Sequence, residues 1–353
     1  MKTIVPKHIK NFLPYLSSRK IGLSGKIFLN ANESPYYKIF TQTYHTLNRY
    51  PEFQDSKLLQ KYSKYSRVSE EQILITRGSD EAIDLLIRTF CNSRKDLVMY
   101  FPPTYDMYKI CAQILNVKTI RIPSIKNFQL NLTEIFKNLQ SVKLIYICNP
   151  NNPTGTLINS LDLIYILKNI SIFCLVVIDE AYIEFSIENS SVKLLSKYSN
   201  LVILRTLSKA FGLAGIRCGF ILSSVNVIKF LKKVLAPYPI PSPVSSIAKI
   251  ALKKENYKKI QKNILKILKN RDFLVSKILK LSFIQKIYHS QTNFVLIKFT
   301  ESQKVFKYLL ENGIVVRDQS HKNFLNNCLR ISIGTFEECS ELITILYKML
   351  KME

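Results

Sequence analysis

The sequence predicts an α/β protein: a large domain built on a mainly parallel sheet covered by helices, and a smaller α+β domain. Three observations lead to this prediction. Five short apolar runs end in polar or glycine-bearing turns, and helical patterns lie between them, as in a parallel sheet that is buried on both faces. The 353 residues suit one large and one smaller domain. After about residue 255 the pattern changes to a Lys-rich amphipathic stretch.

The polar residues that follow these runs predict the position of a site. The runs are "QILIT", "DLVMYF", "KLIYIC", "FCLVVI" and "LVILRT", which are followed or ended by Arg77-Gly78, Pro102, Asn149, Asp179 and Leu207-Ser208. Ligands of open parallel sheets bind beyond the carboxyl ends of the strands. We therefore expect these segments to share one site.

The C-terminal part predicts the second domain. "QTNFVLIKFT", "KVFKYLLENGIVVRD", "CLRISIGT" and "EECSELITILYKML" read in order as strand, helix, strand, strand and helix. We expect an N-terminal arm over residues 1–40 that packs on the small domain, a large domain over 41–255 and a small domain over 256–353.

The net charge suggests one possible function, the binding of anions. With 51 Lys and Arg against 25 Asp and Glu, the formal net charge is +26, which is compatible with a basic protein that binds nucleic acid or other anions without catalysis. The lysines are scattered through helical segments together with many Ile and Asn, and no nucleic-acid motif is recognisable. A diffuse compositional bias explains this pattern better.

The same sequence predicts a cytoplasmic location and no metal. No apolar run reaches the length that crosses a bilayer, and the first residues do not read as a signal peptide. The seven cysteines are an odd number without a CxxC pair, and Cys148, Cys174 and Cys218 lie in apolar runs. We interpret them as small buried residues in a reducing compartment.

Lys209 is the most informative single residue. In "TLSKAFGLAGIRCGF" it follows the apolar run "LVILRT" and precedes "CGFIL", so it is expected inside the fold. A charged amine in an apolar site is costly. Lys209 therefore either loses its charge or bonds to another group.

Two segments before it leave alternatives open. In "GSDEAIDLLIRTF", Ser79 can cap a helix whose first turn holds Asp80 and Glu81, which describes either an ordinary capped helix or a cradle for a phosphate. Asp179 ends a buried strand and needs a partner, either an arginine or a cationic cofactor nitrogen. Tyr182 could hydrogen-bond to the same ligand.

The ordered set of motifs closely resembles the fold-type-I pyridoxal-phosphate aminotransferases, and among them the histidinol-phosphate aminotransferase family. The resemblance runs nearly from end to end. It is carried by "LPYLSSR", "LNANESP", "RYPEFQ", "RGSDEAIDLLIR", "PPTYDMY", "CNPNNPTG", "DEAYIEF", "RTLSKAFGLAGIRCGF", "VVRD" and "LRISIGT".

The resemblance implies an enzyme that transfers an amino group from glutamate to imidazole-acetol phosphate in histidine biosynthesis. The products are histidinol phosphate and 2-oxoglutarate, formed in a ping-pong cycle. Broad aromatic aminotransferases and threonine-phosphate decarboxylases share the pattern and stay as alternatives. The implied protein is a homodimer that binds small-molecule substrates and neither nucleic acid nor membrane.

The resemblance also implies roles for cofactor-binding residues. Lys209 forms the internal aldimine with pyridoxal phosphate and then shuttles a proton, and Asp179 keeps the pyridine nitrogen protonated. Tyr182 and Asn152 hydrogen-bond to the phenolic oxygen, and Tyr105 stacks on the ring. The cofactor phosphate is held by Ser79, Asp80, Glu81, Ser208 and Arg217, and by Tyr50 of the partner subunit.

Four residues are implied in substrate binding. Arg330 receives the carboxylate of glutamate in one half-reaction and the phosphate of histidinol phosphate in the other. Arg317 helps to bind the second anionic group, unless it forms a salt bridge with Asp318 or another surface acid. Tyr15 closes over the substrate, and Asn32 also binds it.

Overall fold

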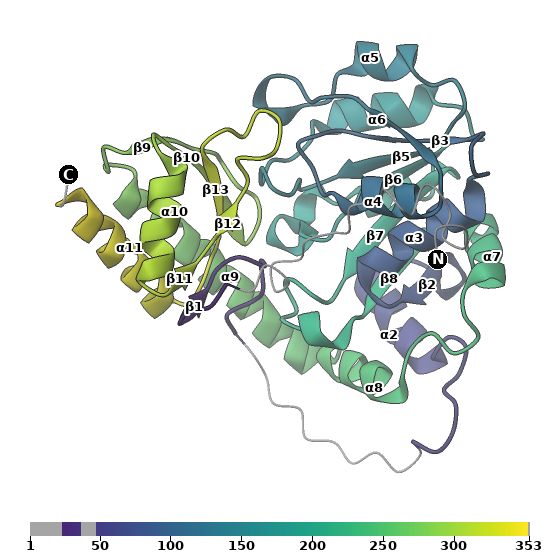
Figure 1. Cartoon of the computed structure of the whole chain (residues 1–353). Coiled ribbons are helices and arrows are strands. Elements are labelled where there is room, and N and C mark those ends of the chain that lie inside the picture. Colours follow the sequence, from purple (N-terminus) through teal and green to yellow (C-terminus); the bar gives the residue numbers. More distant parts are fainter. Residues whose placement is uncertain (1–22, 37–46, 352–353) are drawn as a thin grey trace, which may run out of the picture.

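The computed structural model describes residues 23–36 and 47–351 and has the predicted mainly parallel sheet. Its seven strands lie in the order β2-β8-β7-β6-β5-β3-β4 (Figure 1). All neighbours are parallel except β8, which runs antiparallel to β2 and β7. The strands are β2 Ile73–Thr76, β3 Leu97–Tyr100, β4 Lys118–Arg121, β5 Val142–Cys148, β6 Leu175–Asp179, β7 Leu201–Thr206 and β8 Gly219–Ser223.

Helices cover both faces of this sheet, which explains the continuous apolar runs. Ile73 and Ile75 of β2 belong to one buried cluster, and Leu74 between them belongs to a second cluster on the opposite face. The α-helices of this part are α2 Ser56–Ser66, α3 Gly78–Phe90, α4 Met107–Ile114, α5 Leu132–Lys137, α6 Ser160–Asn169, α7 Val225–Val234 and α8 Ser242–Ala251. Single 3-10 turns are η1 Glu70–Gln72, η2 Lys126–Phe128, η3 Ile183–Phe185, η4 Ile187–Asn189, η5 Ser191–Leu194 and η6 Ala214–Ile216.

The second unit contains an antiparallel sheet in the order β12-β13-β10-β9. Its elements are α9 Lys254–Ile278, β9 Ile284–Ile287, β10 Phe294–Phe299, α10 Ser302–Glu311, β11 Ile314–Val315, β12 Arg317–Asp318, β13 Cys328–Ser332 and α11 Phe336–Leu350. The order expected for the C-terminal part is present, with β9 in addition. The short strand β1 Ile27–Phe28 pairs with β11, so the described part of the N-terminal segment lies on this unit.

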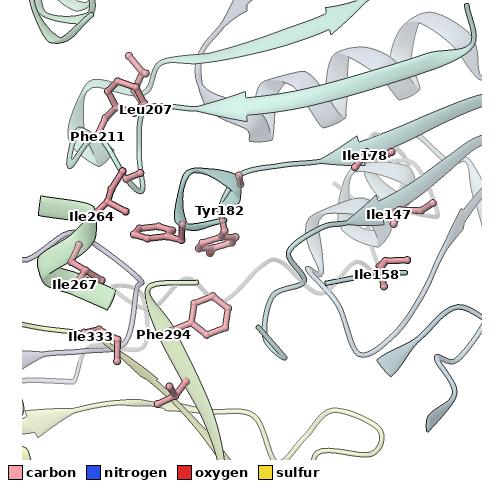
Figure 2. Packing of buried hydrophobic residues seen from close by; sticks show 14 of the residues in the cluster. Ile147, Ile158, Ile178, Tyr182, Leu207, Phe211, Ile264, Ile267, Phe294 and Ile333 are labelled. Atoms are coloured by element: carbon pink, nitrogen blue, oxygen red, sulfur yellow. The ribbon is translucent and has the colours of Figure 1, made fainter. Parts of the chain in front are cut away.

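One hydrophobic core joins the two units. Helix α9 buries Ile260, Ile264 and Ile267, a spacing of four and three residues that forms a stripe along one side of the helix. In Figure 2, Ile264 and Ile267 lie between Phe211, which follows β7, and Ile333, which follows β13. This shared core fixes the small unit against the carboxyl ends of the large sheet. Among the helices of residues 23–36 and 47–351, none is long and apolar enough to span a bilayer.

Candidate active site

A cavity of about 230 Å³ lies where the predicted segments meet. It brings together eleven of the residues predicted for the site: Asn32, Ser79, Asp80, Tyr105, Asn152, Asp179, Tyr182, Ser208, Lys209, Arg217 and Arg330. Ala31, Glu33, Cys148, Ala181, Thr206 and Ala214 complete its lining. The structure therefore brings residues from the ends of all five apolar runs to one cavity.

Asp179 is a buried carboxylate without a charged partner. It is the last residue of β6 and only 1% exposed, and no salt bridge to it is found within the described ranges. Its Oδ2 accepts a hydrogen bond from the Tyr108 hydroxyl at 2.8 Å, and its Oδ1 accepts one from the backbone N–H of Ala181 at 3.1 Å. Burial raises the pKa of Asp179 to about 6. The arginine partner left open by the sequence is not found there, and the cavity beside the carboxylate suits a cationic ring nitrogen.

Lys209 presents its amine to the same cavity. The Nζ atom donates a hydrogen bond to the Ala31 carbonyl at 3.3 Å and lies 5.7 Å from the centre of the Tyr182 ring. Burial, with a smaller contribution from the charge of Arg330, lowers the pKa of Lys209 to about 8. The amine can therefore be neutral near physiological pH, which nucleophilic and base chemistry requires.

The start of α3 forms an anion cradle. The helix begins at Gly78, with Arg77 at the N-cap position, so the prediction of Ser79 as the N-cap was wrong. No described side chain caps the helix, which leaves N–H groups of its first turn available to an anion. Gly78 has a φ of 79°, and a Cβ there would lie 2.8 Å from Nη2 of Arg217. Only glycine therefore lets the arginine approach so closely.

Arg217 completes the cradle from the loop after β7. Its Nη1 donates to Oγ of Ser208 at 3.3 Å, and its Nη2 lies 3.2 Å from Oδ2 of Asp80. Asp80 also accepts a hydrogen bond from the Tyr105 hydroxyl at 2.8 Å. A guanidinium, a hydroxyl and helix N–H groups are the donors that a phosphate prefers.

Tyr182 and Asn152 are each held by one neighbour. Asn32 donates from Nδ2 to the Tyr182 hydroxyl at 3.0 Å, and Ser332 fixes Asn32 through hydrogen bonds to both its backbone N–H and its Oδ1. Asn152 accepts a hydrogen bond through Oδ1 from Arg330 at 2.6 Å. Residues of both units thus converge on the cavity wall.

Arg317 and Arg330 lie directly opposite each other on β12 and β13. Arg330 is 7% exposed, lines the cavity and donates to the Asn30 carbonyl at 2.9 Å. Arg317 does not line the cavity. The two arginines are therefore neighbours across the strand pair, and of the two only Arg330 lines the cavity.

Two further residues predicted for the site, Glu81 and Tyr50, do not contribute side chains to the cavity of their own chain. Glu81 receives two hydrogen bonds from Arg77 and forms an ion pair with it at 2.6 Å. The side chain of Glu81 thus serves the N-terminus of α3, and only its backbone remains available to a phosphate. Tyr50 is 80% exposed and away from the cavity of its own chain. Tyr15 lies outside the described residues.

Sequence reasoning missed Tyr108, the hydroxyl partner of Asp179. Tyr108 lies three residues after Tyr105 and is fully buried on α4. The sequence did hold an indication that Tyr108 lies near the site, because it follows Tyr105 by three residues, close to one helical turn. Cys148, Cys174 and Cys218 are buried as predicted, and all seven cysteines are free.

The donor set fits pyridoxal phosphate: an amine for its aldehyde, an unpaired buried carboxylate for its ring nitrogen and a cradle for its phosphate. The comparisons agree. The profile of the family "Aminotransferase class I and II" matches residues 25–346. The chain is 57% identical, over 98% of both chains, to the histidinol-phosphate aminotransferase of Buchnera aphidicola subsp. Cinara cedri (strain Cc).

Solved structures share the fold. The histidinol-phosphate aminotransferase from Clostridium acetobutylicum has a TM-score of 0.84 and 25% identity, and the comparison covers 93% of this chain and all of that one. The enzyme of the same name from Sinorhizobium meliloti, in complex with pyridoxal-5'-phosphate, has a TM-score of 0.88 and 20% identity, with 99% and 98% covered.

The chain thus belongs to the class I and II aminotransferases, and within them to the histidinol-phosphate aminotransferases. It is a pyridoxal-phosphate-dependent transaminase of fold type I. The alternative of a basic binding protein without catalysis gains no support from these relatives.

Proposed function

We propose that the chain transfers an amino group from glutamate to imidazole-acetol phosphate, giving histidinol phosphate and 2-oxoglutarate in histidine biosynthesis. The observation that carries the proposal is a single cavity that contains the Lys209 amine, the Asp179 carboxylate and the Arg330 guanidinium. The first two serve the cofactor, and the third serves an anionic substrate. The name of the 57% identical relative supports the choice of substrate.

Pyridoxal phosphate, once bound, supplies an electron sink for the carbon that bears the amino group. Asp179 would hold a proton on the ring nitrogen, because an ion pair offsets the cost of keeping this carboxylate buried. Tyr182 and Asn152 would hydrogen-bond to the phenolic oxygen, and Tyr105 would pack on the ring. Arg217, Ser208 and the first turn of α3 would hold the phosphate.

Lys209 acts as the base at the substrate carbon. Its pKa of about 8 makes it a competent acceptor near neutral pH and, once protonated, a competent donor. The Ala31 carbonyl, 3.3 Å from Nζ, directs one N–H of the amine. Ala31 precedes Asn32, so the same short segment positions both Lys209 and Tyr182.

Arg330 would bind the carboxylate of glutamate and, in the other half-reaction, the phosphate of histidinol phosphate. Arg317, directly across the strand pair, would help to bind the second anionic group and would make the site doubly cationic, which favours a phosphate most. Asn32 lines the same cavity as Arg330 and would contact the substrate. The assignment of Tyr15 as a residue that closes over the substrate stays a prediction.

We also propose a homodimer in which Tyr50 reaches the cofactor phosphate of the partner subunit. Tyr50 stacks on Tyr238 with ring centroids 4.4 Å apart, and the two rings are 80% and 51% exposed. Two stacked, exposed tyrosines are unusual for a surface in contact with water. A second copy that covers them would bury both rings.

The proposed protein acts in the cytoplasm on small molecules. Its proposed parts are an N-terminal arm over residues 1–40, a large domain over 41–255 and a small domain over 256–353. The start of α9 at Lys254 and the pairing of β1 with β11 support these boundaries.

A substrate panel tests the proposed function. We expect kcat/KM for histidinol phosphate to exceed that for phenylalanine by at least about tenfold, which corresponds to about 1.4 kcal/mol of transition-state binding. Equal values for the two would instead indicate a broad aromatic aminotransferase. Release of CO₂ from threonine phosphate, without transfer of its amino group, would indicate a decarboxylase.

A further inference from the structure

A lysine of the small unit contacts the segment that carries Tyr105. Lys322 lies in the loop between β12 and β13, and its Nζ donates to the Thr104 carbonyl at 2.9 Å and lies 2.6 Å from Oδ1 of Asp106. Thr104 and Asp106 flank Tyr105 on both sides. The contact joins residues 216 positions apart in the chain and bridges the two units.

The side chain of Lys322 is well placed for a fixed contact. It is 12% exposed, against 48% for Asp106. An ammonium that is mostly removed from water needs charge-assisted hydrogen bonds, and here a carbonyl and a carboxylate provide them. Loss of either partner would therefore release the loop rather than merely remove one surface charge.

On the large unit, Lys322 contacts a segment whose side chains already form hydrogen bonds with other residues of that unit. The Tyr105 hydroxyl donates to Asp80, which pairs with Arg217 in the anion cradle. The Thr104 hydroxyl donates to Oδ1 of Asn151 at 2.7 Å. Lys322 adds a contact from the small unit to this segment.

On the small unit, the same loop is continuous with the two opposed arginines. The backbone N–H of Lys322 donates to the Gln319 carbonyl, and the N–H of Gln319 donates to the Cys328 carbonyl. Gln319 follows β12, which carries Arg317, and Cys328 begins β13, which carries Arg330. The backbone that carries Lys322 is thus hydrogen-bonded to the strand pair that carries both arginines.

We propose that Lys322 is a positioning residue that locks the small unit onto Thr104 and Asp106, and so sets the spacing between Tyr105 and the Arg317–Arg330 pair. The contact itself does not depend on the proposed function, but the roles of the arginines and of Tyr105 rest on it. Substrate anions bound by the arginines would be held in register with the ring that Tyr105 covers.

A direct role of Lys322 in anion binding is the competing explanation, and Asp106 separates the two. If Lys322 positions the loop, Asp106→Asn weakens the contact of Lys322 with Thr104 and Asp106, which we call the lock, and lowers activity. If Lys322 binds the substrate anion, removal of the neighbouring carboxylate frees the amine and leaves affinity unchanged or higher. Asp106 does not line the cavity, so Asp106→Asn leaves the cavity wall intact.

Hydrogen exchange on the cofactor-free full chain tests the lock without any substrate. We expect Lys322→Met and Asp106→Asn to raise exchange, by on the order of tenfold, in peptides from both 101–108 and 319–327. Lys307→Met is the matched control, because Lys307 lies on α10 of the same unit with a 79% exposed side chain. Faster exchange confined to 319–327 would overturn the lock.

Kinetics of the loaded enzyme complete the test. We expect each variant to lower kcat/KM for histidinol phosphate by on the order of tenfold, the double variant to lose little more than one single variant, and Lys322→Arg to recover most of the loss. Additive losses, or unchanged or higher activity of Asp106→Asn, would contradict the proposal. The exchange result stands even if the preferred substrate differs, so failure of the lock and failure of the proposed function are distinguishable.

Discussion

Replacing Asp179 with asparagine should remove a loss of stability that the cofactor-free protein undergoes as pH rises, and it should inactivate the enzyme. The carboxylate is 1% exposed, and burial moves its pKa from 3.8 to about 6. Two pKa units correspond to about 3 kcal/mol against the charged form. Well below pH 4, Asp179 is protonated in both the folded and the unfolded state. Because the pKa is raised in the folded state, only that state keeps the proton between pH 4 and 6. The free energy of unfolding therefore falls with rising pH over that range.

The variant carries no such pH dependence. Asparagine cannot accept hydrogen bonds from both Tyr108 and Ala181 with its single oxygen, which costs about 1–3 kcal/mol at every pH. From pH 5 to pH 7.5, the free energy of unfolding of the unmutated protein should therefore fall by about 1–2 kcal/mol more than that of the variant. This shift with pH, rather than the absolute difference, isolates the ionisation of Asp179.

Urea unfolding of the cofactor-free proteins at pH 5, 6 and 7.5 measures this shift. Asp272→Asn is the control, because that carboxylate is 72% exposed on α9 and its replacement should leave the pH dependence unchanged. With pyridoxal phosphate, we expect Asp179→Asn to retain the cofactor but to lose most turnover. A pH-independent difference in stability, or a near-normal turnover, would refute the reasoning.

Two further predictions concern the partner subunit and the substrate. Mixing inactive Tyr50→Ala and Lys209→Ala variants under conditions that exchange subunits should restore some activity, because one site of each mixed dimer carries neither change; no recovery after verified exchange would place Tyr50 in the site of its own chain. Arg317→Ala should weaken substrates that carry a phosphate most, by roughly 2–5 kcal/mol in kcat/KM, whereas Arg330→Ala should impair both half-reactions. Equal losses for histidinol phosphate and glutamate in Arg317→Ala would argue against a phosphate role.

Much of the fold was predictable because the inner strands are buried on both faces. The apolar runs that end at Asp179 and Thr206 became β6 and β7 almost residue for residue. Strands β4 and β9 were not predicted. Both are edge strands, and residues such as Lys118 and Lys286 face solvent, so neither forms an apolar run.

The site was predictable as far as its residues follow strands of the large sheet. Resemblance added Arg330 and Asn32, which lie in or beside the small unit and line the cavity. The contact of Lys322 with Asp106 could not be predicted, since it depends on how two units pack across 216 residues. The helix cap predicted at Ser79 was wrong by two residues, because Arg77 takes the N-cap position and its backbone N–H donates a hydrogen bond to Glu81.

The central claim is that Lys209 is the residue that bonds to the cofactor in the cavity beside Asp179. Reduction of the holoenzyme with borohydride makes such a bond permanent, and peptide mapping then identifies the lysine. We predict a cofactor label on Lys209, in the peptide that contains "TLSKAFG", and no label in Lys209→Ala. A label on any other lysine would contradict the assignment of the active site.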